Sequence, residues 1–373
     1  MVTKKVVVKP ATKLSKTVGF SLSSLYTSTL DAIEKRQSFE TSSVEDIPPM
    51  STGVLAHDML LGGGIRPSWY SAVGAEQSAK TTSALTFMAA AVKSDVPLVH
   101  FSDYEGSSSA SGPYIRSIMA SVGLKMTIAE LFGKKAVDGS WTVSPRVRYR
   151  SESALESFFD YMHAVLSELP DKRIIHGKWW LVFDDTKANK AKLGEHADTA
   201  MAKRHGAGIW LPAQDGNLQA IFFVDSYPAM LPSDQDKEEG NNSLALQARA
   251  FSKHIPRVKG RMARKMVAVV GINQLRAVPM AMYGPKENEP GGNALKLFSD
   301  ARIRHTSRSL SAHPFAGYKT GKDFNEAEPS VEVEGGTDKY RLVHVKTTKN
   351  KLSMPGREAF LRIWVEDGTG TAR

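Results

Sequence analysis

The sequence predicts an α/β protein in which a mostly parallel sheet is flanked by helices and finished by antiparallel strands at its C-terminal edge. From about residue 70 onward, apolar runs of strand length alternate with helix-like patterns, the order that joins parallel strands through helices. A phosphate-binding motif follows the first of these runs. The last segments are strand-like with no helix between them, which indicates antiparallel neighbours.

Composition narrows the class of protein. The chain has 373 residues, a formal net charge of +10 and no cysteine. Without cysteine, neither a disulfide framework nor a thiolate zinc site can form, and no apolar run approaches the roughly 18 residues of a membrane span. We therefore expect a cytoplasmic protein with no membrane partner. The net positive charge favours a polyanionic partner.

Residues 1–50 are predicted to form a basic N-terminal arm, a short helix and a linker that contact another subunit. The arm holds several lysines and almost no acid; they are Lys4, Lys5, Lys9, Lys13 and Lys16. Contact with nucleic acid, contact with a neighbouring subunit and a solvated tail all remain open. Residues 21–36 have helical spacing, and Pro48-Pro49 closes the linker. Residues 51–373 are predicted to form the core.

The central motif is the stretch 73–82, Val-Gly-Ala-Glu-Gln-Ser-Ala-Lys-Thr-Thr, between a strand-like and a helical run. Such a loop directs backbone N–H groups toward an anion at the helix N-terminus. Lys80 would reach the β- and γ-phosphates of a nucleotide, and the Thr81 hydroxyl would hold Mg²⁺. Ala79 replaces the second glycine of the usual pattern and tolerates positive φ less well, so a polar turn is the alternative. The residues expected at the phosphates are Gly74, Ala75, Glu76, Gln77, Ser78, Ala79, Lys80, Thr81 and Thr82.

Polar side chains follow three further apolar runs. The run 97–101 leads to Glu105, the run 218–224 ends at Asp225, and the run 266–272 leads to Gln274. Beside a phosphate loop, a strand-end acid can orient an attacking water, a second can hold Mg²⁺ through water, and an amide can sense a γ-phosphate. These are the roles predicted for Glu105, Asp225 and Gln274. A surface acid is the alternative for Glu105.

Other segments are less specific. Tyr114 could stack on a base or be buried. Residues 153–169 have the spacing of an amphipathic helix. Residues from about 171 to 217 interrupt the alternation and are predicted to be a surface insertion, within which 179–183 reads as a strand. The histidines and acids of this segment lack the spacing of metal ligands.

Two loops are expected to be functional. Residues 233–243 are polar and acidic and precede a helix from 244 to about 258 that carries Arg249. Residues 275–295 are too long and too rich in Gly and Pro for a simple connection. Strands are then predicted over 299–306, 340–347 and 358–365, with a polar excursion over 312–338.

Five segments occur in the order found in the RecA recombinase family, which the chain resembles over most of residues 20–366. The most specific is Asn273-Gln274-Leu275-Arg276 running into Gly-Gly-Asn-Ala-Leu-Lys at 291–296, which resembles the second DNA-binding loop of bacterial RecA. In addition to these five, the segment 346–351, Lys-Thr-Thr-Lys-Asn-Lys, is similar to the family's Lys-Asn-Lys element. The other matching segments are Ser51-Thr52-Gly53 with Asp58, the phosphate loop, Asp103-Tyr104-Glu105, and the strand ending at Asp225-Ser226.

The resemblance implies a RecA-type P-loop ATPase core that uses ATP and Mg²⁺. It implies that Lys80, Glu105 and Gln274 act in hydrolysis, and that Lys349 and Lys351 reach the nucleotide of a neighbouring subunit. Tyr114 would stack on adenine. The residues implied at the DNA are Leu244, Arg249, Arg276, Tyr283, Gly291, Gly292, Asn293 and Lys296.

Several departures from the family pattern point to a divergent, bacteriophage-type member. Ala79 is unlike the bacterial enzymes but similar to phage recombinases of the UvsX type. The 171–217 segment has no counterpart in the family core, the first DNA loop is acidic, and Pro279 stands where an aliphatic wedge is common. The chain also stops near Arg373, before the family's small C-terminal domain, so a truncated product is the alternative.

The implied function is an ATP-dependent DNA recombinase that forms helical filaments on single-stranded DNA and pairs it with homologous duplex DNA in recombination, repair and recombination-dependent replication. The implied partners are single- and double-stranded DNA, further copies of the chain with ATP at the subunit interface, and single-strand-binding and loader proteins. A viral member would work in the host cytoplasm or a phage replication compartment. A hexameric RecA-fold helicase and a non-catalytic ATP-binding mediator are the alternatives.

Overall fold

A computed structural model describes residues 47–106, 112–151, 153–233, 243–277, 287–308, 330–333, 336–366 and 369–372. All of these residues belong to one folding unit, which begins at Ile47. The predicted arm and helix before residue 47, most of the loop 233–243, and Tyr283 lie outside the described ranges. Within them, no helix combines the length and apolar character that crossing a membrane requires.

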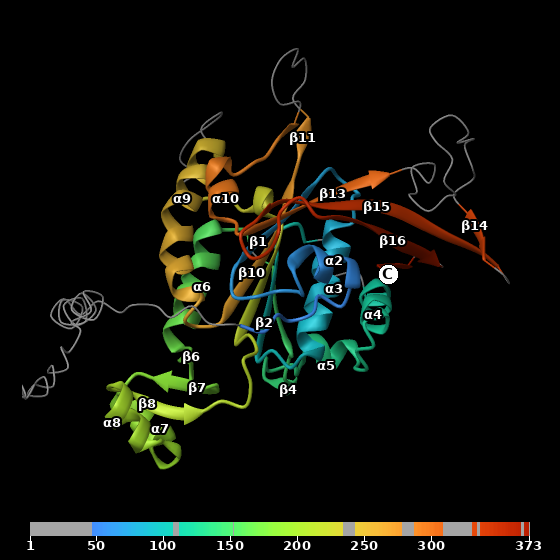
Figure 1. The fold of residues 1–373 in the computed structure, drawn as a ribbon. Helices are drawn as coiled ribbons and strands as arrows, with labels where there is room; N and C mark the ends of the chain where they lie inside the picture. The colour runs from blue at the N-terminus through green and yellow to red at the C-terminus, as the bar shows by residue number, and fades with distance from the viewer. Residues whose placement is uncertain are drawn as a thin grey trace, which may run out of the picture. The chain divides into compact units, whose positions relative to one another are not determined.

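The chain forms one large mixed sheet with its strands in the order β17-β16-β15-β13-β1-β10-β9-β2-β5, and β14 pairs with β15 (Figure 1). Every neighbouring pair from β13 to β5 is parallel, and the pairs from β13 outward to β17 are antiparallel. The strands are β1 (Trp69–Gly74), β2 (Leu98–Asp103), β5 (Val147–Ser151), β9 (Ala220–Asp225), β10 (Val267–Gln274), β13 (Ala301–Arg308), β14 (Ser330–Val333), β15 (Gly336–Asn350), β16 (Glu358–Glu366) and β17 (Thr369–Ala372).

Helices cover both faces of the parallel strands. One group packs through a core cluster that includes Leu85 and Ile118, and the other through a cluster that includes Phe159 and Phe251. The first group is α2 (Leu55–Leu61), α3 (Lys80–Lys93), α4 (Gly112–Ser121) and α5 (Ile128–Phe132), and the second is α6 (Leu155–Glu168), α9 (Ser243–Met262) and α10 (Gly292–Phe298). The sequence prediction of a flanked, mostly parallel sheet is therefore confirmed.

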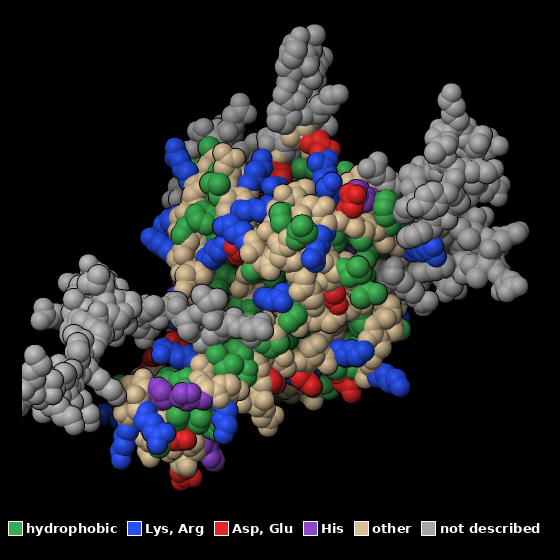
Figure 2. Space-filling view, in the orientation of Figure 1, with side chains coloured by type: hydrophobic (Ala, Val, Ile, Leu, Met, Phe, Trp, Pro, Cys, Tyr) green, Lys and Arg blue, Asp and Glu red, His purple; other side chains and the backbone are tan. Residues whose placement is uncertain are grey.

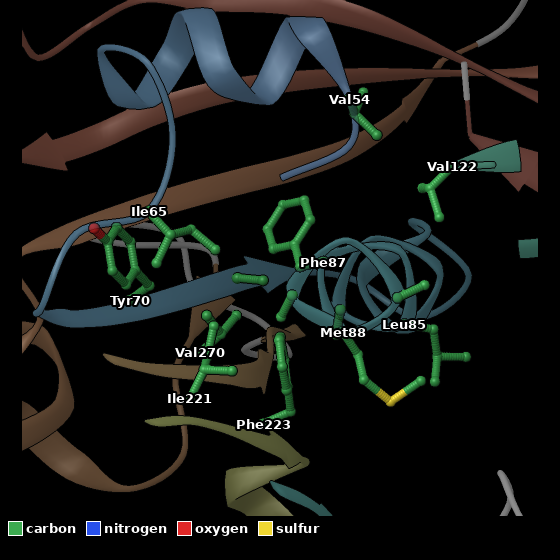
Figure 3. Packing of buried hydrophobic residues seen from close by; sticks show 14 of the residues in the cluster. Val54, Ile65, Tyr70, Leu85, Phe87, Met88, Val122, Ile221, Phe223 and Val270 are labelled. Carbon is green, nitrogen blue, oxygen red and sulfur yellow. The ribbon is translucent and has the colours of Figure 1, made fainter. Parts of the chain in front are cut away.

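The central strands are buried on both faces, which explains their unbroken apolar sequences. In β9, Ile221 and Phe223 join the cluster beneath α3, whereas Phe222 and Val224 join the cluster beneath α6 and α9. Figure 3 shows Phe223 and Val270 of the sheet in one cluster with Phe87 and Met88 of α3. This packing fixes α3, and with it the loop that precedes α3, over the middle of the sheet.

Residues 171–212 form a separate small structure at the lower left of Figure 1. Its three antiparallel strands are in the order β6-β7-β8, and the middle strand contains the run 179–183 that the sequence predicts as a strand. Its elements are β6 (Asp171–Ile175), β7 (Lys178–Phe183), α7 (Lys187–Leu193), the 3₁₀ turn η2 (Gly194–His196), α8 (Thr199–His205) and β8 (Ile209–Pro212). The interpretation of this segment as a family-specific insertion stays a prediction.

Short elements complete the fold. They are β3 (Lys134–Lys135), β4 (Trp141–Val143), the 3₁₀ turn η3 (Tyr227–Ala229), β11 (Arg276–Ala277) and β12 (Glu287–Asn288). Two sequence expectations need correction. The edge strand β5 was missed, because its Val-Arg-Tyr-Arg-Ser sequence is polar. The Gly-Gly-Asn-Ala-Leu-Lys block lies at the start of α10 rather than within a loop, because Ala294 and Leu295 are buried against α9.

Candidate active site

The residues predicted to bind a nucleotide meet at the carboxyl edge of the parallel strands. Gly74 ends β1 and pairs with Gln274 at the end of β10. Asp103 ends β2 and pairs with Asp225 at the end of β9. Because β9 and β10 are themselves neighbours, four consecutive strands deliver polar groups to one place. Ligands bind outside the carboxyl ends of strands in open α/β sheets for this reason.

The loop after β1 is tightly folded. A Cβ added to Gly74 would lie 2.4 Å from the His305 carbonyl oxygen and 2.6 Å from Ser78 Oγ, so only glycine fits there. Ser78 Oγ donates to the Ala75 carbonyl at 2.7 Å. Ala79, immediately before α3, has φ 63° and ψ 27°, a left-handed conformation that glycine adopts more readily than alanine. The alanine therefore adopts the loop geometry despite its Cβ.

Lys80 lies inside the loop, with 6% of its surface exposed. Its Nζ donates to the Ala75 carbonyl at 2.5 Å and to Ser78 Oγ at 3.3 Å. Burial lowers the pKa of Lys80, and the carboxylates of Asp225, Glu105 and Glu76 act in the opposite direction. The ammonium group is thus surrounded by oxygen atoms at the position from which it could reach a bound phosphate.

Thr81 and Asp225 form the candidate magnesium site. Thr81 Oγ1 donates to Asp225 Oδ2 at 2.8 Å. Burial raises the pKa of Asp225 to about 7, with further contributions from the Glu105 and Asp103 carboxylates, against the Thr81 hydrogen bond and Lys80. A hydroxyl and a carboxylate side by side are the hard oxygen ligands that Mg²⁺ takes together with substrate phosphates. The residues therefore fit the ion.

Glu105 is held by two donors at the ends of different strands: Ser226 directly follows β9, and Gln274 ends β10. Ser226 Oγ donates to Glu105 Oε1 at 2.6 Å, and Gln274 Nε2 donates to the same oxygen at 2.8 Å. The predicted water-orienting acid and the predicted phosphate sensor are therefore in direct contact. The sequence reasoning assigned no role to Ser226. Its position directly after a strand-end aspartate was the available signal.

A cavity of about 550 Å³ lies over the loop. Within the part of the chain that the structure describes, its lining contains one ammonium group, on Lys80, and three carboxylates, on Glu76, Glu105 and Asp225. A polyphosphate would meet net negative charge here unless a divalent cation accompanied it. The lining residues are Glu76, Gln77, Ser78, Ala79, Lys80, Thr81, Thr82, Glu105, Asp225, Ile272, Gln274 and Ile363.

Tyr114 does not line this cavity. Its hydroxyl lies 2.5 Å from Thr82 Oγ1, and its ring packs against the core cluster beneath α3. The sequence left open whether Tyr114 stacks on a base or is buried. In the folded chain its ring packs in the core. Stacking on adenine stays a prediction.

Comparison with known proteins finds a family with a related sequence. Residues 213–321, which include β9, β10, α10 and β13, match the family model described as the RecA N-terminal domain. This part of the chain is similar to the RecA N-terminal domain. The chain's mixed sheet, central phosphate loop and flanking helices form a RecA-type core.

The matched RecA proteins come from several bacteria. Protein RecA of Aquifex pyrophilus is 34% identical over 141 residues, covering 37% of this chain and 34% of that protein. Protein RecA of Thermus aquaticus is 31% identical over 161 residues, covering 43% and 41%. Protein RecA of Borreliella burgdorferi (strain ZS7) is 26% identical over 250 residues, covering 65% and 58%. The chain therefore matches about one third to three fifths of the length of these relatives.

In this RecA-type core, most of the residues predicted to contact DNA come together beyond β10. The helices α9 and α10 pack against each other, and β11 leads away beside them (Figure 1). Arg249 on α9, Arg276 on β11 and Asn293 on α10 are exposed, whereas Lys296 is half-buried and Gly291 is buried. Figure 2 shows several basic side chains over these helices. Leu244 lies in the first turn of α9, and Gly292 is the first residue of α10.

The base of the loop between β11 and β12 is anchored to the sheet. Arg304 pairs with Glu287 at 2.5 Å, and Arg302 pairs with Glu289. Asn273, next to Gln274, donates through Nδ2 to the Pro290 carbonyl at 3.2 Å. The two neighbouring amides at the end of β10 thus make different contacts. Gln274 contacts the candidate catalytic acid, and Asn273 contacts the segment before α10.

Lys349 and Lys351 do not line the cavity of their own chain. Lys349 Nζ donates to the carbonyls of Lys296 and Leu297, at 2.9 and 2.8 Å, and so caps the C-terminal end of α10. Burial and the neighbouring cations of Lys351 and Lys259 lower the pKa of Lys349. Lys351 is exposed after the end of β15. Their action on a neighbouring subunit stays a prediction.

Proposed function

We propose that the protein is an ATP-dependent DNA recombinase that forms helical filaments on single-stranded DNA and promotes pairing and strand exchange with homologous duplex DNA. The proposal includes DNA-stimulated hydrolysis of ATP to ADP and phosphate, and roles in recombination, repair and recombination-dependent replication. Its partners are DNA and further copies of the chain, with single-strand-binding and loader proteins as expected accessories. A bacteriophage origin is part of the same proposal.

The observation that carries the proposal is the contact between Gln274 and Glu105. Gln274 lies at the cavity, one residue before Leu275 and two before the exposed Arg276 of β11. A change in the hydrogen bonding of Gln274 would therefore shift the start of the loop that the sequence assigns to DNA. This supports coupling between the nucleotide state and DNA binding, which a simple nucleotide-binding protein would not need.

Several polar residues at and beside the cavity have tasks in hydrolysis. When bound, Mg²⁺ neutralises charge on the phosphates. The loop N–H groups and Lys80 bind the β- and γ-phosphates, because they provide donors and a cation at the N-terminus of α3. Thr81 and Asp225 hold the metal position. Glu105 accepts a hydrogen bond from the attacking water and orients it, while Ser226 keeps the carboxylate in place.

DNA contact is expected to be electrostatic. The exposed cations Arg249 and Arg276 and the half-buried Lys296 are placed on three adjoining elements. Neutralising a cation that contacts phosphate reduces affinity and the salt dependence of binding, with little change in sequence preference. Arg276→Ala should therefore weaken binding to single-stranded DNA without changing ATP affinity. Lys178→Ala, at an exposed lysine of the 171–212 structure, is the matched control.

Electron microscopy of the full chain with ATP and single-stranded DNA tests the proposal. Open helical filaments together with DNA-stimulated ATP hydrolysis are the expected result. Closed rings would instead indicate a hexameric helicase. ATP binding with neither assembly nor turnover would indicate a non-catalytic mediator, and either outcome would overturn the recombinase proposal.

A further inference from the structure

The buried carboxylate of Asp103 shapes the turn that carries Glu105. Asp103 Oδ1 accepts hydrogen bonds from the backbone N–H of Glu105 at 3.1 Å and of Gly106 at 2.8 Å. Such side-chain contacts to the next residues fix the direction in which the chain leaves a strand. The position of the Glu105 side chain therefore depends on how the Asp103 carboxylate is oriented.

Tyr149 holds the other oxygen of that carboxylate. Its hydroxyl donates to Asp103 Oδ2 at 2.6 Å. Tyr149 lies on the edge strand β5, whose residues 147–151 pair with β2, and its ring stacks against Phe101 and contacts Phe132 edge-on. The ring is thus fixed by its neighbours, and its hydroxyl is directed at a fully buried carboxylate.

We propose that Tyr149 and Asp103 are positioning residues for ATP hydrolysis, because together they hold the turn that aims Glu105 at the attacking water. The proposal rests on the proposed ATPase function. The two oxygens of Asp103 have separate tasks: Oδ1 sets the backbone after β2, and Oδ2 is held by Tyr149 so that the carboxylate does not rotate. Hydrogen bonds from hydroxyl groups to carboxylates are short and strong. Losing this one would therefore free the Asp103 carboxylate to rotate.

This arrangement complements the contacts to Glu105 itself. Ser226 and Gln274 hold its carboxylate from the side of β9 and β10, whereas Asp103 holds its backbone from β2. Removing the Tyr149 hydroxyl leaves the contacts of Ser226 and Gln274 in place. We therefore expect a partial loss of turnover rather than loss of the site.

The first experiment compares Tyr149→Phe with Tyr161→Phe. Tyr149→Phe should lower kcat about tenfold, the usual effect of removing a residue that orients a catalytic group, with ATP affinity unchanged. Tyr161 lies on α6 near the same edge, where its ring contacts His100 and Phe222. Tyr161→Phe should leave kcat unchanged. Equal effects of the two variants, or a change confined to KM, would contradict the proposal.

The second experiment asks whether Tyr149 acts through Glu105. In single-turnover measurements, Tyr149→Phe should slow hydrolysis in the parent chain but have no further effect in a Glu105→Gln background. The same factor in both backgrounds would mean that Tyr149 acts elsewhere, and the inference would fail. Asp103→Asn should retain more activity than Asp103→Ala, because the amide oxygen can still accept the two backbone hydrogen bonds.

The third experiment does not require turnover. In hydrogen exchange, the amides of Glu105 and Gly106 should exchange faster in Tyr149→Phe than in the parent chain and in Tyr161→Phe. Unchanged exchange would overturn the inference even if the protein is an active ATPase. Faster exchange in a chain that hydrolyses no ATP would leave the turn geometry supported while the proposed function fails, so the two failures are distinguishable.

Discussion

The phosphate loop places its two critical small residues under different constraints. Gly74 has no space for a Cβ because the His305 carbonyl and Ser78 Oγ occupy it. Ala79 has space but adopts a left-handed φ of 63°, which is less favourable for alanine than for glycine by about 1 kcal/mol. One position is limited by contact, the other by backbone conformation.

Substitution at these two positions should therefore give opposite results. Ala79→Gly should change ATP affinity little, because N–H groups rather than the side chain contact the phosphates. Its free energy of unfolding should change by less than about 1 kcal/mol, since glycine also gains freedom in the unfolded chain. Gly74→Ala should remove ATP binding. Binding of a fluorescent ATP analogue and urea unfolding measure both effects.

A large gain in ATP affinity in Ala79→Gly would show that the natural loop is impaired, and would favour the mediator alternative. Normal ATP binding in Gly74→Ala would contradict the packing seen at the end of β1.

Glu105 and Ser226 give a graded test of the catalytic assignment. Glu105→Gln should retain ATP binding and slow DNA-stimulated hydrolysis by about 100-fold or more, because the amide no longer acts as a proton acceptor for the water. Ser226→Ala should slow it less, since Gln274 still holds the carboxylate. Steady-state kinetics with ATP affinity measured in parallel distinguish the two. Parental turnover in Glu105→Gln would show that another group orients the water.

Two elements meet beneath the phosphate loop through a pair of buried histidines. His57 on α2 and His305 on β13 lie with ring centroids 5.6 Å apart, and His57 also contacts Phe87 of α3 edge-on. Among the described residues, none lies within hydrogen-bonding geometry of the two ring nitrogens of His57. Burial lowers the pKa of His57 to about 3. Burial, His57 and Lys80 lower the pKa of His305, against the Ser78 backbone.

This pair should make the core sensitive to acid. The folded chain holds both rings neutral, whereas the unfolded chain takes up protons below the ordinary pKa of 6.5. The stability that His57 contributes is therefore present above pH 6.5 and is lost as the pH falls toward 3, by about 1.4 kcal/mol per pH unit. The lowered pKa of His305 acts in the same direction. Urea unfolding at pH 7.5, 6.5 and 5.5 measures the slope.

Replacing both histidines by leucine should reduce that slope. The double variant His57→Leu/His305→Leu keeps the side chains large and apolar but removes both titrating rings. His196→Leu, at an exposed residue of η2, should leave the parental slope. An unchanged slope in the double variant would place the acid sensitivity in other groups, such as the buried His100, whose pKa is also lowered by burial.

Assembly is the property of the molecule as a whole on which the proposal depends. Lys349 caps α10 of its own chain through two carbonyls, and Lys259 contacts the same helix end through the Phe298 carbonyl and Asp300. If Lys349 also acts on the nucleotide of a neighbour, its contribution resembles an arginine finger supplied in trans, about 10³- to 10⁵-fold in rate. Lys259 offers a control that shares the cis contact.

Mixing variants should detect the trans contribution. Lys80→Ala and Lys349→Ala should each be nearly inactive alone, and so should Lys351→Ala. Mixtures of Lys80→Ala with Lys349→Ala should regain some ATPase activity, because some interfaces pair an intact loop with an intact lysine. Mixtures of Lys80→Ala with Lys259→Ala should gain nothing beyond the activity of the Lys259 variant, since that defect lies within one subunit.

Filament formation by each variant must be confirmed by electron microscopy before the mixtures are compared. If the variants assemble together and no mixture exceeds its components, the lysines do not act across the interface. The filament mechanism of hydrolysis would then be wrong, although the nucleotide site of the single chain would stand.

The sequence was sufficient for the parts of this protein that depend on local pattern. Continuous apolar runs indicated strands buried on both faces, and the strand–loop–helix order around Lys80 indicated an anion site at a helix N-terminus. Polar residues after three such runs were predicted to act beside the phosphate loop, as a water-orienting acid, a metal-binding acid and a phosphate sensor. The cavity lined by Lys80, Glu105, Asp225 and Gln274 has these origins.

Packing between distant segments decided the rest. The strand order placed β10 between β1 and β9, and so brought Gln274 and Ser226 to the same oxygen of Glu105. Tyr149 reaches Asp103 because a polar edge strand pairs with β2. The histidine pair forms because α2 packs over β15 and β16, next to β13 in the sheet. For the same reason Tyr114 packs behind Thr82 and does not itself line the cavity. Such contacts depend on which elements become neighbours in the folded chain, and the spacing of residues along the sequence does not contain that information.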